Sequence, residues 1–249
     1  MDKRLHTPLI FVHMFKAGGS SLRQIIRSQF PRDAQVWLSK GAPAKLEELT
    51  ALSQAERDRF DLFMAHEPYG LHDLLTRRAA YITLLRDPVD RVLSFFYYVK
   101  RLKTHYLRRF GFTDETTLEE FITWRNKELD NVQTRLLVPR SEGQIAFGEV
   151  DESFFQKALA NLNRIDRVGI LERMDDFLQL LEAAEGWDVS SAPVKNRTES
   201  RPSVAEHSDA VIARIREMNA FDIRLYEVAR RRFEEDWAEC QPMLKNVDA

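Results

Sequence analysis

A buried strand meets a helix in the segment FVHMFKAGGSSL, residues 11–22. The apolar run Pro8–Met14 predicts the strand, and the pattern of Ser20–Phe30 predicts the helix. Gly18 and Gly19 stand between the two, where they let the backbone turn tightly and approach a ligand closely. A strand, a glycine turn and a helix in this order are typical of an α/β fold.

The glycine loop also predicts an anion site. We expect the amides from Ala17 to Ser21 to point outward at the helix N-terminus, where the partial positive charge favours an anion. Ser20 and Ser21 add hydroxyl donors, and Lys16 adds a full positive charge. The lysine precedes the glycines, so the loop differs from the nucleoside-triphosphate loop GxxxxGK followed by Ser or Thr. The alternative interpretation is a plain Gly-Gly turn with a serine capping the next helix.

Further short apolar runs predict the rest of a sheet. Strands are expected at Asp61–Ala65, Ala80–Leu85, Gln35–Leu38 and Arg167–Leu171. Strands alternating with helices predict an α/β fold with a mainly parallel sheet flanked by helices on both faces, and ligands bind beyond the carboxyl ends of such strands. The expected helices, which make the C-terminal half helix-rich, are Leu71–Arg78, Leu118–Lys127, Asn131–Leu137, Ser153–Leu162, Asp175–Ala184, Val204–Met218 and Ala220–Trp237.

The length, composition, net charge and cysteine count of the chain exclude several classes of protein. A chain of 249 residues with 44% hydrophobic and 31% charged residues fits one large globular domain, expected to span residues 1–249. The net charge of −2 argues against non-specific nucleic-acid binding. Cys240 is the single cysteine, which excludes an intrachain disulfide and a multi-cysteine metal site. The apolar core Leu9–Val12 is too short for a signal peptide or a membrane span, so a cytoplasmic protein is expected.

A second anion-binding signal lies in YITLLRDPVDRVLSFFYY, residues 81–98. Asp87 suits an N-cap and Pro88 suits the first turn of a helix. Arg86 leaves the strand end, and Ser94 shares a helix face with Arg91, so a guanidinium and a hydroxyl are expected to grip a phosphate together. The alternative is an ordinary capped helix with a salt-bridging arginine. Both signals, however, fall at the same edge of one sheet.

Together the two segments resemble the sulfotransferases that use 3′-phosphoadenosine 5′-phosphosulfate (PAPS), especially the branch of the heparan sulfate 2-O-sulfotransferases and their bacterial relatives. KAGGSS (16–21) is similar to the 5′-phosphosulfate loop, and RDPVDR (86–91) with Ser94 is similar to the 3′-phosphate motif. Phe15 and Ala17 depart from the usual Pro and Thr. The resemblance continues in order through AHEPYGL (65–71), NVQTR (131–135), VGILER (168–173), NRTESRP (196–202) and residues 219–233.

The resemblance implies a P-loop-like three-layer fold and the transfer of a sulfuryl group from PAPS to an acceptor hydroxyl, with PAP as product and no metal. Lys16 would then neutralise charge on the oxygen that bridges phosphate and sulfur. His66 would be the general base, since imidazole titrates near neutral pH; a structural histidine is the alternative. Donor contacts are implied for Lys16, Ala17, Gly18, Gly19, Ser20, Ser21, Arg86, Ser94, Arg197 and Arg201.

Other functions stay open at this point. A kinase-like phosphotransferase would need a lysine inside the glycine loop and acidic residues for Mg²⁺, and a non-catalytic nucleotide-binding module would keep the fold without turnover. The resembled branch favours a carbohydrate acceptor, while a lipid, a peptide tyrosine or a small metabolite are the alternatives. The sequence predicts no oligomeric state. His72 is a possible neighbour of His66, and His13 is expected to pack in the core or support the loop.

Overall fold

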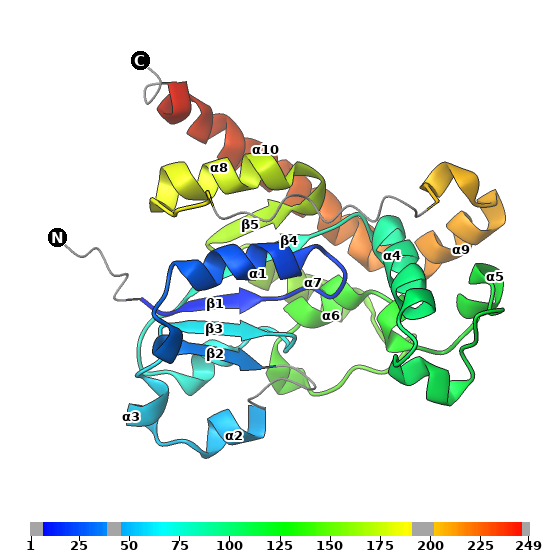
Figure 1. The fold of residues 1–249 in the computed structure, drawn as a ribbon, viewed down its shortest axis with the longest axis horizontal. Coiled ribbons are helices and arrows are strands. Elements are labelled where there is room, and N and C mark those ends of the chain that lie inside the picture. Colours follow the sequence, from blue (N-terminus) through cyan, green and yellow to red (C-terminus); the bar gives the residue numbers. More distant parts are fainter. Residues whose placement is uncertain (1–6, 39–45, 191–201, 246–249) are drawn as a thin grey trace.

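The computed structural model describes residues 7–38, 46–190 and 202–245. Within these ranges the strands form one five-stranded sheet in the order β2-β3-β1-β4-β5, with every neighbouring pair parallel (Figure 1). The predicted parallel α/β sheet is therefore confirmed. Its strands are β1 Leu9–Val12, β2 Gln35–Leu38, β3 Leu62–Ala65, β4 Ala80–Leu85 and β5 Arg167–Ile170.

The register of the sheet aligns the carboxyl ends of its central strands. Val12 of β1 pairs with Ala65 of β3 on one side and with Thr83 of β4 on the other. The residues that follow these strands therefore leave the sheet at a common edge. In Figure 1 the strand arrows end on the side that faces α4, α5 and α9.

Helices surround the sheet. Helix α1 lies over one face, and α6 and α7 lie against the other, as right-handed crossovers require (Figure 1). Helix α10 runs along the β5 edge and contacts α6, α7 and α8. The helices are α1 Gly19–Ser28, α2 Leu46–Ala51, α3 Gln54–Arg57, α4 Pro88–Arg101, α5 Leu118–Phe121, α6 Val132–Leu137, α7 Glu152–Leu162, α8 Met174–Glu185, α9 Asp209–Met218 and α10 Ala220–Lys245.

Short 3₁₀ turns replace parts of three predicted helices. The helix expected at Leu71–Arg78 is only the turn Leu71–Leu74, because the next residues run extended toward β4 and Arg77 binds the carbonyls of Asp58 and Phe60. The other two predictions were also too long: Leu118–Lys127 contains α5 and a separate turn, and Val204–Met218 breaks where Ser208 caps α9. The turns are Arg32–Ala34, Leu71–Leu74, Tyr106–Phe110, Lys127–Leu129, Arg140–Glu142, Leu171–Arg173 and Val204–Glu206.

Two apolar clusters fill the interior. One lies between the sheet and its helices, with Phe11 and Phe63 fully enclosed. The other joins α4 to α5, α9 and the turn Tyr106–Phe110. Phe15, in the loop after β1, packs edge-on against Phe95 of α4 with ring centroids 5.4 Å apart, so this loop lies where the two clusters meet. No helix in the described ranges is long and apolar enough to cross a membrane.

Candidate active site

The loop after β1 takes a conformation that only small residues allow at two positions. Gly18 precedes α1 with a φ of 75°, and a Cβ built there would lie 2.3 Å from Cδ1 of Leu171. A Cβ on Gly19 would lie 2.1 Å from the ring of His13. The two glycines are therefore required by close packing against β1 and the end of β5, as well as by the turn itself.

The amides of the loop are divided between internal and outward roles. The Ala17 amide donates to the carbonyl of Met14 at 3.3 Å, and the Ser21 amide donates to the carbonyl of Gly18 at 3.2 Å. The expectation that all amides from residue 17 to residue 21 face a ligand was thus too broad. Gly19 and Ser20 open α1, where N–H groups have no acceptor within the helix, so their amides stay available to an acceptor outside the helix.

Lys16 lies among aromatic and cationic side chains. Its Nζ is 3.9 Å from the centroid of the Tyr98 ring on α4. Burial, and then the positive charges of Arg101 and Arg86, lower the pKa of Lys16 from 10.5 to about 8. Positive charges gathered around one buried ammonium favour the binding of an anion among them.

His66 follows β3 and is held by the first residue after β1. Its Nδ1 lies 2.8 Å from the carbonyl oxygen of His13. Because a carbonyl can only accept, Nδ1 carries the proton, and Nε2 is left with a free lone pair. Burial is the main cause that lowers the pKa of His66, and Arg23 adds to it, while the hydrogen bond to His13 opposes it. The imidazole is therefore neutral near pH 7 and can accept a proton at Nε2.

The ring of His13 lies against both His66 and the glycine loop. It stacks on the His66 ring with centroids 4.1 Å apart and fills the space under Gly19. Burial, and then His66 and Arg23, lower the pKa of His13 to about 2, so the ring stays neutral. The expected role of His13 as a support for the loop is confirmed. Trp37 of β2, which the sequence did not single out, packs edge-on against His66 at 5.2 Å.

Arg86 connects the end of β4 to the glycine loop. Its guanidinium donates to the carbonyl of Lys16 at 3.2 Å. The side-chain amide of Gln133 grips the Arg86 backbone from both sides, accepting from its N–H and donating to its carbonyl, each at 2.9 Å. Ser94 is half-buried on α4, on the helix that Asp87 caps through the amide of Asp90. The structure thus brings Lys16, His66 and Arg86 together, as predicted.

Arg91 does not join them, although its spacing puts it on the same helix face as Ser94. Arg91 is fully buried, and its guanidinium donates to the carbonyl of Glu128 at 3.1 Å. The face that Arg91 occupies points into the protein because the start of α10 packs there. Asp222 of α10 lies within electrostatic reach and favours the charged guanidinium.

The same buried network fixes Gln133. Both oxygens of Asp222 accept backbone amides of α6, from Gln133 at 3.0 Å and from Thr134 at 2.7 Å. Asn131, just before α6, adds hydrogen bonds in the opposite direction, since its Oδ1 accepts from the backbone N–H groups of Phe221 and Asp222, each at 3.0 Å. The start of α10 therefore holds α6, and α6 holds the backbone of Arg86.

Three further residues are sequence-based candidates for the site. Arg197 and Arg201 lie outside the described residues, so their roles stay predictions. His72 does not border His66, because its Nδ1 lies 2.8 Å from the hydroxyl of Tyr81 near the amino end of β4. Within the described ranges no three His, Cys, Asp or Glu side chains are grouped so that they could hold a metal ion.

Comparisons with known proteins point to one family. The model of the "Sulfotransferase family" matches residues 4–228. Human heparan-sulfate 6-O-sulfotransferase 1 is 26% identical over 91% of this chain and 66% of its own length. Mouse heparan sulfate 2-O-sulfotransferase 1 is 29% identical over 43% of this chain and 32% of its own. The chain thus spans just under two thirds of the first of these relatives.

Two solved structures are also similar. Mouse sulfotransferase SULT7A1 in complex with PAP has a TM-score of 0.45 and 18% identity, over 96% of this chain and 86% of its own. A sulfotransferase from Alicyclobacillus acidocaldarius has a TM-score of 0.43 and 16% identity, over 88% of this chain and 96% of its own.

Proposed function

Because the chain belongs to the sulfotransferase family, we propose that it moves a sulfuryl group from PAPS to a hydroxyl group of a carbohydrate. The observation that carries the proposal is the pairing of Lys16 and His66 at one edge of the sheet. One supplies a cation for a leaving anion, and the other supplies a neutral imidazole with Nε2 free to accept a proton.

The loop residues fit the donor. Gly18 and Gly19 bring the backbone close to the start of α1, where the Gly19 and Ser20 amides would hold the 5′ end of the donor. Arg86, anchored through Gln133, and the hydroxyl of Ser94 would hold its 3′-phosphate. Ala17 is fully buried and its amide is engaged, so we assign it to the shape of the loop rather than to a donor contact.

PAPS supplies the sulfuryl group, and PAP is the product that leaves. His66 takes the proton of the acceptor hydroxyl at Nε2 while its Nδ1–H stays on the carbonyl of His13. Lys16 neutralises the negative charge that grows on the departing phosphate oxygen. The oxygen–sulfur bond to the acceptor forms as the sulfur–oxygen bond to PAP breaks, so charge and proton balance without a metal.

A carbohydrate acceptor is supported by the names of the similar curated proteins, which are heparan-sulfate sulfotransferases. We therefore place an acceptor sugar beside His66, on the side of the sheet that faces α4 and the turn Tyr106–Phe110.

The test measures donor binding and transfer separately. Calorimetry should show that the protein prefers PAP to AMP and ATP, and that Arg86→Ala and Ser94→Ala each weaken PAP binding about tenfold or more, since each removes a phosphate contact. Transfer of labelled sulfate from PAPS to saccharides should then be detectable. Equal affinity for PAP and AMP in the folded protein would refute the donor, and labelling only of non-carbohydrate acceptors would refute the acceptor class.

A further inference from the structure

Lys16 is held by contacts from outside its own loop. Its backbone has a φ of 64°, and it is one of two non-glycine residues with a positive φ in the described part of the chain. This left-handed conformation is unfavourable for a residue with a side chain, so it persists where the surroundings impose it. The carbonyl of Lys16 accepts from the guanidinium of Arg86 at 3.2 Å, and its ammonium lies 3.9 Å from the centroid of the Tyr98 ring. The strained residue is therefore held at its backbone and at the end of its side chain.

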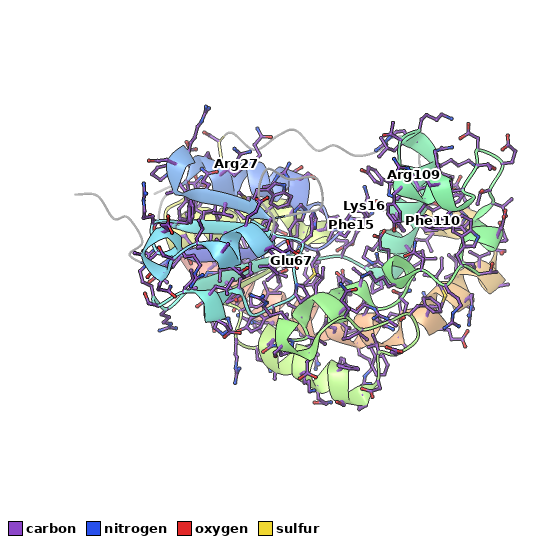
Figure 2. The ribbon with its side chains drawn as sticks, turned by 90° about the horizontal axis from the view of Figure 1, so that it is seen from below. Phe15, Lys16, Arg27, Glu67, Arg109 and Phe110 are labelled. Carbon is purple, nitrogen blue, oxygen red and sulfur yellow. The ribbon has the colours of Figure 1, made fainter. Side chains whose placement is uncertain are left out.

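The Tyr98 ring is itself fixed by its neighbours. It is half-buried on α4 and meets two other rings edge-on, Phe15 with centroids 6.3 Å apart and His105 with centroids 5.6 Å apart. Figure 2 shows Phe15 and Lys16 at the side of the sheet that faces the segment with Phe110. The ring thus offers the ammonium a face at a defined place beside the glycine loop.

The charged groups that face the Lys16 ammonium are cations. Arg101 of α4 and Arg86 after β4 both lower the pKa of Lys16 by their positive charge. Burial is the main cause that lowers the pKa of His105, so this ring stays neutral and adds no charge. Among the described residues no Asp or Glu forms an ion pair with Lys16. The π face of Tyr98 lies where an ion pair would otherwise compensate the ammonium.

An aromatic ring suits this position better than a carboxylate. The ring attracts a cation through its quadrupole and carries no negative charge of its own. A carboxylate would repel an anionic donor, and it would be left as an unpaired, partly buried charge once the ammonium moved to the donor. The ring has neither disadvantage, so it can hold the lysine and then release it to an anion.

We infer that Tyr98 is a positioning residue for Lys16: its ring holds the ammonium, in the charged form, beside the glycine loop before the donor binds. For its role in transfer the inference rests on the proposed function, and it deepens that function by explaining how the cation is kept ready. Once the donor is bound, its anionic oxygens stabilise the ammonium in place of the ring. Tyr98 therefore serves the capture of the donor more than the transfer step.

The test measures the pKa of Lys16 directly in the free protein. Lysine side chains are acetylated with a trace of acetic anhydride from about pH 6 to about pH 10, and mass spectrometry gives the rate at Lys16 relative to the exposed Lys127. The proteins are the wild type, Tyr98→Phe, Tyr98→Leu and the control Phe154→Leu. The control removes a half-buried ring that lies 5.5 Å from another lysine, Lys157. Thermal denaturation checks that each variant is folded.

The acetylation rate follows the deprotonation of Lys16, because only the neutral amine reacts. The wild type and Tyr98→Phe should share one midpoint, since both keep the ring. In Tyr98→Leu the midpoint should lie about 0.5–1 pH units lower, because the charged form loses its cation–π contact. Phe154→Leu should leave the midpoint unchanged. An unchanged or higher midpoint in Tyr98→Leu, a Tyr98→Phe midpoint equal to that of Tyr98→Leu, or an equal shift in the control would overturn the inference.

Two further measurements connect the contact with the donor. Calorimetry should show PAP binding weakened about threefold to tenfold in Tyr98→Leu and unchanged in Tyr98→Phe, because the cation is no longer in place beforehand. In sulfate transfer from PAPS, kcat/KM should fall by the same factor while kcat stays nearly level. Unchanged PAP affinity in Tyr98→Leu, or a loss confined to kcat, would overturn the positioning role. Acetylation needs neither donor nor acceptor, so failure of the proposed function would appear in the wild-type PAP titration and leave the acetylation comparison intact.

Discussion

For the proposed sulfuryl transfer, Lys16 predicts a pH dependence that can be worked out from its surroundings. Burial and the neighbouring Arg101 and Arg86 lower the pKa of Lys16 to about 8. The charged fraction of the Lys16 side chain is then about 90% at pH 7 and about 10% at pH 9. Raising the pH removes the cation that neutralises the leaving group, so kcat/KM for PAPS should fall about tenfold per pH unit above pH 8.

The complex with bound donor should show a different pH dependence from the free protein. An anionic donor beside Lys16 favours its charged form, so kcat, which reports the complex, should stay level to higher pH than kcat/KM. On the acid side, the lowered pKa of His66 keeps the base neutral, and the loss of activity should begin below the usual histidine range. The assay is initial-rate sulfate transfer from about pH 5 to about pH 10 at constant ionic strength, since screening would otherwise vary.

Lys16→Arg is the diagnostic variant. Arginine stays charged throughout this range, so the alkaline fall in kcat/KM should disappear, at a lower overall rate because the fork of the guanidinium does not match the ammonium position. An alkaline fall of the same shape in Lys16→Arg would refute the assignment to Lys16. A wild-type profile that stays flat to pH 10 would refute the lowered pKa.

Three further predictions concern His66 and two residues that hold the site in place. His66→Ala should lower kcat by about 10²–10⁴-fold with the dissociation constant of PAP unchanged, and a comparable loss of PAP affinity would contradict the role of base. Gly19→Ala puts a Cβ 2.1 Å from the His13 ring, so it should destabilise the fold by about 1–3 kcal/mol in chemical denaturation and lower turnover; a wild-type stability would show that the ring moves freely. Asp222→Asn should lower the free energy of unfolding by about 3–5 kcal/mol, because two amides lose a charged acceptor within a buried charge network. The control Glu217→Gln breaks an exposed ion pair on α9 and should leave the melting temperature nearly unchanged.

Much of the sheet and the centre of the site follow from local pattern. Short apolar runs locate the strands, and Gln35–Leu38 and Ala80–Leu85 match their predicted bounds. Since parallel strands end at one edge, the positions of Lys16, His66 and Arg86 after three strands are enough to predict that they meet. The helix start at Asp87 and Pro88 carries its own capping chemistry.

The features that the sequence could not predict depend on residues far apart in the chain. Helical spacing alone puts Arg91 and Ser94 on one face, but the packing of α10, more than a hundred residues later, decides that Arg91 is buried. The hollow lined by Tyr106, Trp124 and Phe147 has no local signature, because Arg135 holds one of its walls through the backbone carbonyls of Ile145 and Ala146. Contacts of a side chain with remote carbonyls put no constraint on residue type at the accepting position.

The central place of β1 has a consequence for biosynthesis. β1 precedes its partners β3 and β4 in the chain, and the last strand, β5, follows only at residues 167–170. The central strand therefore leaves the ribosome with both edges unpaired, and more than seventy residues separate each of its residues from the partner in β4 that covers the second edge. We expect translation rate and chaperone supply to govern how much folded protein a cell obtains, because long-range parallel pairing is slow and leaves apolar edges open to other chains.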